Sequence, residues 1–577
     1  MPRLQDLKSA STIYDVAPLL DFKPKALAYI LYGKTPAANY RSFALAKASG
    51  GSRLIQAPSD DLKLLQRNLS DLLQDCVTEL NAANGWKDQI AHGFKRKRSI
   101  VTNASHHRGR RCVFNLDLSD FFGTINFGRV RGFFITNRHF SLPPRVATIL
   151  AQIACYNNSL PQGSPCSPVI SNLIGHILDI KLVQLAQKTG CTYTRYADDL
   201  TFSTNLPAFP PAIAALVAGQ PHTWVAGNEL GRIITRSGFI INPAKTRMQY
   251  RNSRQDVTGL VVNKKVNIRS EYRRAVRAMV YTLFTAGDFY QNIGGAQAQG
   301  TMSQLHGMLG HIDSVDLYNK SQNQKSGAPA SPKTQIQSKE SQYRRFLVFQ
   351  YFYSATSPVI ICEGKTDNIY LKEAIKRLAA NYPTLASVSL TNNAASLKVR
   401  IFKYPETSTG RILELHGGTG DLKHFIQKYA NEIKKFKAPG LQQPVIVLVD
   451  NDSGKNELSG VIKQITNQQT SWTVPYIYVT GNLYVVPTPY IGGSTESKIE
   501  DFFTSQTLGT ILAGKTFKPD PPFDPALHYG KAIFAEQVVR QNSHTIDFSG
   551  FIPILNVLAD IIAAHAAKQV APTVAQP

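Results

Sequence analysis

The chain has 577 residues, 43% of them hydrophobic and 18% charged, and these proportions exclude a largely disordered chain. This length favours two to four packed domains. The 64 Lys and Arg residues outnumber the 39 Asp and Glu residues and give a formal charge of +25. We therefore expect a polyanionic partner, with nucleic acid first and an anionic membrane surface second.

The sequence favours a cytoplasmic protein without a membrane segment. No run approaches the roughly 18 consecutive apolar residues that span a bilayer, and residues 1–10 lack the apolar core of a signal peptide. The six cysteines are scattered, none in a Cys-x-x-Cys spacing, so we expect reduced thiols without a zinc site or disulfide framework.

The first part of the chain reads as an α+β body. Residues 1–90 show helical periodicity, as in the series Leu62, Leu65, Leu69, Leu72 and Leu73. Short β-rich runs between loops begin near residue 112, and basic helical segments follow near 270–312.

A linker and a second domain are predicted after the α+β body. Residues 316–342 are rich in Ser, Gln, Lys, Gly and Pro, a composition typical of a flexible linker. Beyond it, the apolar runs 358–362 and 444–449 alternate with a helix-like stretch at 368–378. This alternation predicts an α/β domain with a mainly parallel sheet over residues 343–577.

Two acidic turns in the first domain indicate metal-dependent chemistry. Asp198 and Asp199 lie between two strand-like segments, so they fall at the tip of a hairpin, where adjacent acids are costly unless a cation shares them. A second apolar strand delivers Asp117 into a turn. Two Mg²⁺ ions bridged by these carboxylates would activate a primer hydroxyl and stabilise departing pyrophosphate. The alternative for the Asp-Asp pair alone is a solvated turn.

These residues resemble the palm of the reverse transcriptase family, with residues 196–199 (Tyr-Ala-Asp-Asp) matching its Tyr-x-Asp-Asp box. The resemblance implies that two Mg²⁺ ions are held by Asp117, Asp198 and Asp199. It places Phe122 at the steric gate that excludes a ribose 2′-hydroxyl. Asp120 falls where the family holds the incoming triphosphate through the main chain.

Further matches follow in the family's order. Gln162 and Gly163 resemble a loop that lines the nucleotide pocket, and Lys245 resembles a lysine that protonates pyrophosphate as general acid. Residues 87–111 hold eight Lys and Arg and one acid, and Lys95 or Arg98 is positioned in sequence to reach the triphosphate. Read alone, these features would be a plain turn, a surface lysine and a solvated charged face.

Two short signatures resemble those of retron reverse transcriptases, which make a branched RNA–DNA product from their own structured noncoding RNA. They are residues 103–107 (Asn-Ala-x-x-His) and residues 257–259 (Val-Thr-Gly). The resemblance, together with the basic thumb-like helix, implies RNA contacts by Asn103, His107, Val257, Thr258, Gly259, Arg273 and Arg274. A surface histidine is the alternative for His107.

The second domain carries acids at its predicted strand ends, where α/β sheets place their sites: Glu363, Asp450 and Asp452. This arrangement resembles the Toprim domain of topoisomerases, bacterial primases and overcoming-lysogenization-defect nucleases. The resemblance implies that Glu363 acts in acid–base chemistry or metal binding, that Asp450 and Asp452 bind one or two Mg²⁺, and that Glu500 completes the site. The 87 residues from Glu363 to Asp450 depart from the common spacing. A binding module without cleavage is the alternative.

Together these features predict a right-hand polymerase followed by a Toprim-like α/β domain. Fingers and palm would cover about residues 1–262 and the thumb about 263–315. The implied partners are deoxynucleoside triphosphates, the chain's own noncoding RNA, its DNA copy and a nucleic-acid target of the Toprim domain, with an oligomeric nucleoprotein complex left open. Retrons act in antiphage defence, where the RNA–DNA product restrains a toxic effector. The alternatives are a group II intron maturase and a nucleoprotein scaffold.

Overall fold

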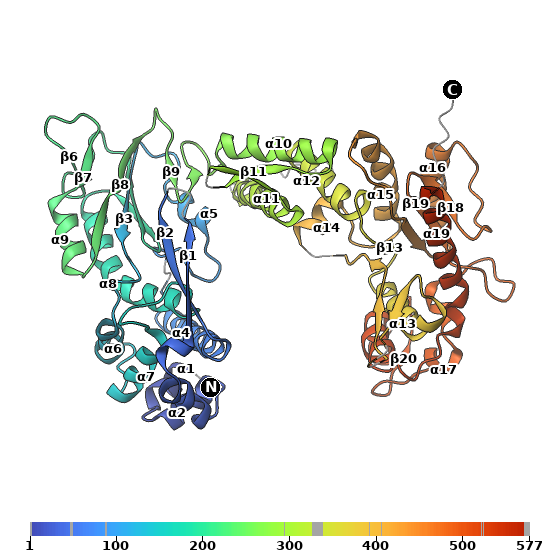
Figure 1. Cartoon of the computed structure of the whole chain (residues 1–577), viewed down its shortest axis with the longest axis horizontal. Helices are drawn as coiled ribbons and strands as arrows, with labels where there is room; N and C mark the ends of the chain where they lie inside the picture. The colour runs from blue at the N-terminus through green and yellow to red at the C-terminus, as the bar shows by residue number, and fades with distance from the viewer. Residues whose placement is uncertain are drawn as a thin grey trace. The chain divides into compact units, whose positions relative to one another are not determined.

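The computed structural model describes residues 3–46, 50–86, 89–293, 295–325, 338–389, 391, 393–404, 407–520, 522 and 524–570. The chain divides into two compact units (Figure 1). The first comprises Met1–Arg273, Asn292–Gln297 and Ser314–Ala328, and the second comprises Arg274–Gln291, Ala298–Asp313 and Pro329–Pro577.

The first unit begins with short helices and a hairpin around a long helix. The elements are α1 (Arg3–Ser9), α2 (Ile13–Leu19), α3 (Pro24–Ala28), η1 (Tyr29–Gly33), η2 (Pro36–Asn39), β1 (Tyr40–Ala46), β2 (Ser52–Pro58) and α4 (Asp60–Ala83). The leucines predicted to form one face of α4 are all buried in the core of this unit, so their helical periodicity is confirmed.

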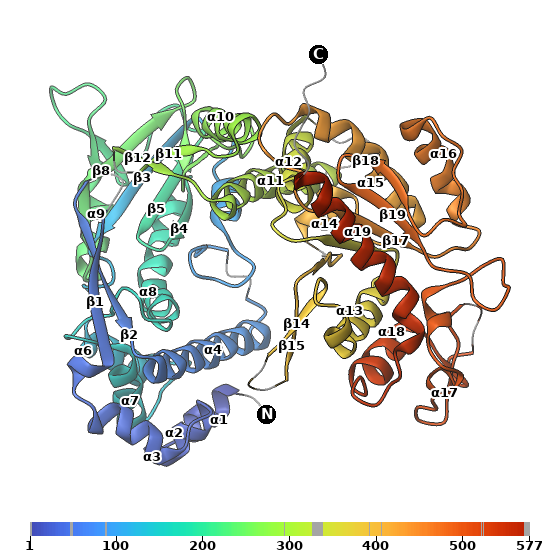
Figure 2. The same ribbon diagram turned by 45° about the vertical axis from the view of Figure 1, so that its right-hand side comes forward.

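A four-stranded antiparallel sheet forms the centre of the first unit, in the order β4-β5-β3-β8. Its strands are β3 (Cys112–Ser119), β4 (Thr192–Tyr196), β5 (Asp199–Thr204) and β8 (Ile240–Tyr250). The sheet shares its apolar core with α6 (Phe127–Thr136), α7 (Pro144–Ala154), α8 (Ser167–Lys188) and α9 (Asn228–Arg236). Figure 2 shows α8 beside β4.

Short elements flank this sheet. They are α5 (Ile100–Ser105) and the hairpins β6 (Ala214–Leu216) with β7 (Trp224–Ala226), and β9 (Asp256–Val257) with β10 (Leu260–Val261). The β9–β10 hairpin packs against α5.

The segment that separates the strands of the two sheets in the sequence differs from the predicted thumb and linker. It contains α10 (Ser270–Ala286), β11 (Tyr290–Ile293), β12 (Ala296–Gln299), α11 (Met302–Lys325) and α12 (Ser338–Val348). Helix α11 continues ten residues beyond the predicted boundary at 315, and residues 338–342 already belong to α12, so both described ends of the predicted linker are helical. Residues 326–337 lie outside the described part of the chain.

Most of α10 groups with the second unit because of its apolar face. The ring of Phe284 lies 5.4 Å from that of Phe349 and 4.9 Å from that of Phe436, and its carbonyl accepts hydrogen bonds from the amides of Lys437 and Ala438. Of the basic residues on this helix, Arg274 and Arg277 are exposed, whereas Arg273 is half-buried.

The second unit is built on a five-stranded sheet in the order β16-β13-β17-β19-β18. Its strands are β13 (Val359–Cys362), β16 (Arg400–Ile401), β17 (Val445–Val449), β18 (Ile477–Thr480) and β19 (Leu483–Pro487). Four strands are parallel, and β18 pairs antiparallel with β19. Every residue of β13 and β17 is buried, as expected for parallel strands covered on both faces.

Helices and short strands complete the second unit. They are η3 (Phe349–Tyr353), α13 (Asp367–Arg377), η4 (Ala379–Asn381), β14 (Ala386–Val388), β15 (Ala395–Leu397), α14 (Ser408–Leu413), α15 (Thr419–Glu432), η5 (Ile433–Lys435), α16 (Lys455–Thr466), η6 (Ile499–Phe502), α17 (Ser505–Leu508), β20 (Thr516–Phe517), β21 (His528–Tyr529), α18 (Lys531–Ile533), η7 (Phe534–Arg540), η8 (Ser549–Phe551) and α19 (Ile552–Val570). Helix α19 lies along the sheet, where the hydroxyl of Tyr484 and Nδ1 of His565 are 3.0 Å apart (Figure 2).

Two helical segments of the described chain reach the length and hydropathy of a membrane span, contrary to the expectation that no segment does. They are Ser167–Lys188 and Ser549–Gln569, which are 56% and 33% buried within the protein. The first is α8, the core helix beneath the four-stranded sheet, and the second carries core residues of the second unit. Burial in the core accounts for the apolar composition of α8, whereas the second segment is only one-third buried.

Candidate active sites

The two acidic turns of the first unit meet at one end of the antiparallel sheet. The register of β3 and β5 pairs Asp117 with Asp199, and the amide of Leu118 donates to the carbonyl of Asp198 at 3.0 Å. Desolvation by the surrounding protein, followed by neighbouring carboxylates, raises the pKa of Asp198 and raises that of Asp199 to about 6, although the Asp199 side chain keeps solvent access. The structure therefore brings the three predicted aspartates together.

Lys245 lies at the same place, as its predicted role requires. Its Nζ donates to Oδ2 of Asp117 at 2.7 Å, and Nδ2 of Asn242 donates to Oδ1 at 3.2 Å. The hydrogen bond to Asp117 is the main cause that raises the pKa of Lys245. Within the described residues, no three Asp, Glu, His or Cys side chains already surround one point as a metal-ligand set. In this structure the Lys245 ammonium group neutralises the Asp117 carboxylate, as a bound cation would.

A buried ion pair supports the turn that carries Asp198, and the sequence analysis missed it. Arg195 is fully buried, and its Nε and Nη2 atoms each donate to the Asp179 carboxylate at 2.8 Å. Its Nη1 atom donates to the carbonyl of Ala197 at 3.2 Å. Ala197 adopts a positive φ of 55°, which non-glycine residues seldom adopt. The sequence signal was weak: Arg195 is the one charged residue of β4, among threonines and tyrosines.

The predicted nucleotide-pocket loop is clamped to β2. The amide of Gln56 donates to the carbonyl of Gln162 at 2.8 Å, and a Cβ on Gly163, which has a φ of 134°, would lie 2.6 Å from the Gln56 carbonyl oxygen. Only glycine allows this close approach. The ring of Phe122 is half-buried beside Phe121, whereas Asp120 is exposed at a positive φ of 44°.

The predicted triphosphate-binding cations lie in a turn of the basic segment. The amide of Arg98 donates to the carbonyl of Lys95 at 3.1 Å, and both side chains are half-buried. Their neighbour Arg96 forms ion pairs with Asp71 and Asp75. Lys87 and Asp88 of this segment lie outside the described residues. The nucleotide roles of Lys95 and Arg98 stay predictions.

Asn103 and His107, which were predicted to help recognise or position RNA, are both fully buried, so the surface-histidine alternative is wrong and the RNA role stays a prediction. The His107 ring nitrogens lie 2.7 Å from the Ser203 hydroxyl and 2.8 Å from the Thr194 hydroxyl, and Thr194 also donates to Oδ1 of Asn103 at 2.7 Å. This buried polar cluster ties the helix α5 region to the strands that carry the catalytic turn. The motif therefore forms a structural brace inside the first unit.

The Val-Thr-Gly signature forms the tight turn of the β9–β10 hairpin. Thr258 and Gly259 both have positive φ values, 47° and 82°, which a two-residue type I′ turn requires. Val257 is fully buried, and the Thr258 hydroxyl donates to the carbonyl of Ile100 at 3.1 Å. The hairpin therefore packs against α5, the helix that carries Asn103 of the other retron-like signature.

Burial of His107 predicts an acid-sensitive first unit. Desolvation, followed by His106 and Arg110, holds the pKa of His107 well below its usual value. The unfolded chain would bind a proton near pH 6.5 while the folded chain would not. Stability should therefore fall as the pH drops below about 6.5, by up to about 1.4 kcal/mol per pH unit from this residue. Unfolding midpoints measured from pH 8 to 5 should decline less steeply for His107→Gln than for the parent, and equal slopes would contradict this assignment.

The two thumb-like arginines differ in their surroundings. Nη2 of Arg273 donates to Oδ1 of Asn267 at 2.7 Å and to Oδ1 of Asp316 at 3.2 Å, so this side chain links residues around the start of α10 to α11. Arg274 is exposed. Of the pair, Arg274 therefore fits the predicted contact with nucleic acid better.

A second acidic site lies at the carboxyl ends of β13 and β17, which pair in parallel. Glu363 follows β13, and its Oε2 accepts a hydrogen bond from the amide of Asp450 at 3.1 Å. Its Oε1 accepts one from the Thr419 hydroxyl at 2.6 Å. Oδ1 of Asp452, which is half-buried, accepts from the amide of Gly454 at 2.8 Å.

Buried acids from other segments join this site. Glu500 in η6 is 3% exposed and forms an ion pair with Nζ of Lys531 at 3.0 Å. Desolvation, with added repulsion from Asp367, Glu363 and Glu500, raises the pKa of Asp450 to about 8. Desolvation also raises the pKa values of Glu363, Asp367 and Glu500. Such a cluster is costly unless a cation shares it.

Asp367 and Lys531 were missed by the sequence analysis. Asp367 stands four residues after Glu363, and its Oδ2 accepts from the amide of Gly364 at 2.6 Å. Its position so close to Glu363 in the sequence could have identified Asp367 as part of the site. Lys531 lies 31 residues beyond Glu500, and only the fold brings the two together.

The antiparallel sheet with its paired acidic turns is the palm of a polymerase of the reverse transcriptase class, and residues 45–269 match the family model described as reverse transcriptase (RNA-dependent DNA polymerase). The chain is 32% identical over 281 residues to the retron Ec86 reverse transcriptase of Escherichia coli, a match that covers 48% of this chain and 78% of that protein. The chain therefore belongs to the retron reverse transcriptases.

Two further relatives come from Myxococcus xanthus. The retron Mx65 reverse transcriptase is 35% identical over 292 residues, covering 48% of this chain, and the retron Mx162 reverse transcriptase is 37% identical over 242 residues, covering 39%. The matches span 61% and 48% of those two proteins.

Proposed function

We propose that the first unit is an RNA-directed DNA polymerase in which Asp117, Asp198 and Asp199 hold two Mg²⁺ ions. The register that pairs Asp117 with Asp199, next to Asp198, is the observation that carries this proposal. The donors are hard carboxylate oxygens, which Mg²⁺ prefers, and the raised pKa values of Asp198 and Asp199 reflect charges that a cation would neutralise. Bound ions would stabilise the attacking primer oxygen and the departing pyrophosphate.

The chain's own side chains would select and position the nucleotide. Lys245, now on Asp117, is placed to deliver a proton to pyrophosphate once its carboxylate partner binds metal. Phe122, packed beside Phe121, would limit space at the sugar, and the Gly163 loop would line the base-pair pocket.

Primer extension on an RNA template with deoxynucleoside triphosphates tests this activity. We expect DNA synthesis that depends on Mg²⁺ and on the RNA template. RNA binding without synthesis would instead favour a nucleoprotein scaffold.

We further propose that the template is the chain's own structured noncoding RNA. Membership of the retron family supports this, as does the packing of the β9–β10 hairpin against α5, the helix that carries Asn103. Sequencing of nucleic acid that copurifies with the protein should find single-stranded DNA joined to RNA by a 2′–5′ linkage. Linear DNA primed from an intron RNA would favour a maturase.

For the second unit we propose a Toprim-like nuclease that acts as the effector in antiphage defence. The support is its buried acidic cluster at the carboxyl ends of adjacent parallel strands, a common position for sites in α/β sheets. The donors Glu363, Asp450 and Asp452 are oxygen ligands suited to one or two Mg²⁺, and Glu500 with Lys531 would border them. A module that binds nucleic acid without cleaving it is the alternative.

Removing two of these carboxylates should abolish cleavage by the second unit. Asp450→Ala combined with Asp452→Ala should lower Mg²⁺-dependent cleavage of nucleic acid by at least about 10³-fold, because several kcal/mol of charge stabilisation would be lost. DNA synthesis should be unchanged. The matched control is Asp560→Ala, an exposed acid on α19. Cleavage that persists in the double variant would show that the site lies elsewhere.

A further inference from the structure

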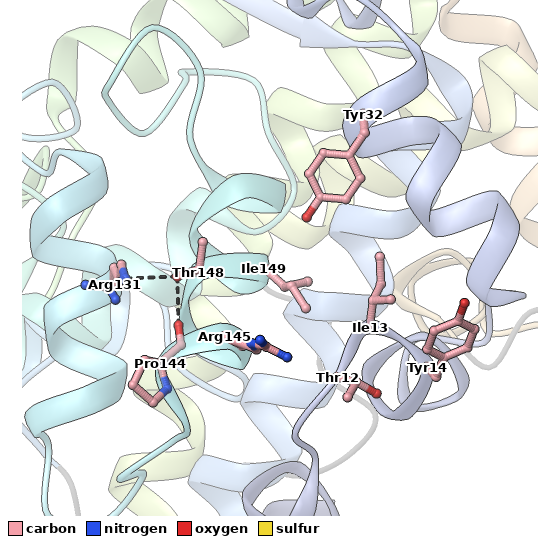
Figure 3. A pocket seen from close by; sticks show the side chains of 9 residues that line it. All are labelled: Thr12, Ile13, Tyr14, Tyr32, Arg131, Pro144, Arg145, Thr148 and Ile149. Carbon is pink, nitrogen blue, oxygen red and sulfur yellow. Dashed lines mark hydrogen bonds between the residues drawn. The ribbon is translucent and has the colours of Figure 1, made fainter.

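A pocket of about 480 Å³ lies in the first unit, apart from the residues assigned to polymerisation. Tyr14 and Tyr32 contribute from the N-terminal helices, and Arg131 and Arg145 contribute from α6 and α7 (Figure 3). Its volume falls in the range of sites that hold one small ligand, such as a single nucleotide.

Exposed aromatic rings mark this pocket. Tyr14 is 70% exposed and Tyr32 is 61% exposed, and the nearby Tyr29 of η1 is 60% exposed. Exposed rings of this size are platforms on which unpaired bases stack, each worth about 1–3 kcal/mol. The Tyr32 hydroxyl donates to Oε1 of Gln152 at 2.9 Å, which fixes the ring at the pocket.

The opposite wall of the pocket is basic. Residues 127–154, which include α6 and α7, contain four arginines and no Asp or Glu. Nε of Arg131 donates to the Thr148 hydroxyl at 2.9 Å, and Arg145 is exposed in the first turn of α7, where the helix dipole adds positive potential (Figure 3). Asp15, next to Tyr14 in the chain, is the nearby acid. Its carboxylate accepts hydrogen bonds from the amides of Ser11 and Thr12, which stabilise its negative charge.

We propose that this pocket binds a segment of single-stranded nucleic acid, with its bases on Tyr14 and Tyr32 and its phosphates on Arg131 and Arg145. Rings beside guanidinium groups are the combination that binds unpaired strands without sequence preference. A duplex would offer no unstacked base to the tyrosines. This surface would hold a template or product strand outside the polymerase centre, and binding here does not require the aspartates.

Binding of labelled 12-nucleotide oligouridylate and oligodeoxyuridylate to the full chain tests the proposal, with unlabelled primer–template duplex present to occupy the polymerase site. Tyr14→Ser combined with Arg145→Glu should raise Kd at least about tenfold and flatten its salt dependence, because one stacking platform and one phosphate contact are lost. Glu near the start of α7 suits the helix dipole, so folding should be kept. Extension of a pre-annealed primer–template should stay within about twofold of the parent, because no polymerase residue is changed.

The matched control is Lys181→Glu, which reverses an exposed charge on α8 outside the pocket and should leave Kd nearly unchanged. Weakened binding of either oligonucleotide by the double variant supports the proposal and identifies the sugar that is preferred. Unchanged Kd in both arms, or an equal loss with Lys181→Glu, would overturn it. A 4-thiouridine probe should also crosslink to peptides that contain Tyr14 or Tyr32, and crosslinks confined to other peptides would count against the pocket.

Discussion

Asp198→Asn should lower the rate of primer extension by at least about 10³-fold, because several kcal/mol of transition-state stabilisation depend on charged metal ligands. Asn keeps the size and hydrogen-bonding shape of the side chain but removes the negative charge. The backbone link from Leu118 to the Asp198 carbonyl does not involve the substituted group. The turn should therefore persist while the chemistry is lost.

Single-turnover extension on an annealed RNA–DNA primer–template would separate loss of chemistry from loss of binding. The rate constant should fall while the Kd of the primer–template changes little. Asp21→Asn is the matched control, since it makes the same chemical change at an exposed residue whose φ of 57° an Asn accepts. Equal synthesis by Asp198→Asn and the parent would remove the polymerase assignment.

Breaking the buried pair beneath the catalytic turn should have the largest effect on stability. Asp179→Asn leaves the buried Arg195 guanidinium without its counter-charge, a change that costs about 3–5 kcal/mol in buried pairs. The Tyr193 hydroxyl also donates to Oδ1 of Asp179, so a second buried partner is disturbed. The unfolding midpoint of the first unit should fall, and activity should fall with it.

A double variant separates stability from positioning. Asp179→Leu with Arg195→Met removes both charges, so it should recover much of the lost stability. It cannot restore the hydrogen bond from Arg195 to the Ala197 carbonyl, so kcat should stay low while KM for nucleotide changes less. Full recovery of kcat together with stability would show that Arg195 does not position the turn.

The control for this pair is on the same helix. Lys188→Met removes an exposed partner of Glu229, 3.8 Å away, and should cost at most about 1 kcal/mol. A comparable loss of stability in this control would argue against a special role for the buried pair.

Sequence patterns predicted the helices and strands that depend on neighbouring residues in the chain. The leucine spacing of α4, the strand before Asp117 and the hairpin of Asp198 and Asp199 follow from periods of 3.6 and 2, because backbone geometry sets those periods. The resemblance of these motifs, in their order, to a reverse transcriptase palm predicted that Asp117 lies beside Asp198 and Asp199. The buried apolar runs likewise predicted the parallel strands of the second unit.

These patterns did not predict contacts between side chains that are far apart in the sequence. A single sequence does not tell which face of a short helix is covered, so the burial of His107 was not predicted, although its ring bonds to strands about 90 residues away. The buried Arg195 escaped notice because charged residues are rarely buried without a partner, and its partner Asp179 lies on α8.

By itself, the sequence determined that this chain carries a reverse transcriptase palm with its aspartates. Each motif is a short run of residues, and the order of the motifs and the alternation of the strands can be seen in the sequence. Tertiary structure alone decided that Asn103 and His107 lie in a buried polar cluster, that most of α10 groups with the second unit, and that Lys531 meets Glu500. The physical reason is that burial and charge pairing depend on which distant segments pack together, and the energy of those contacts is not encoded in any one stretch of the chain.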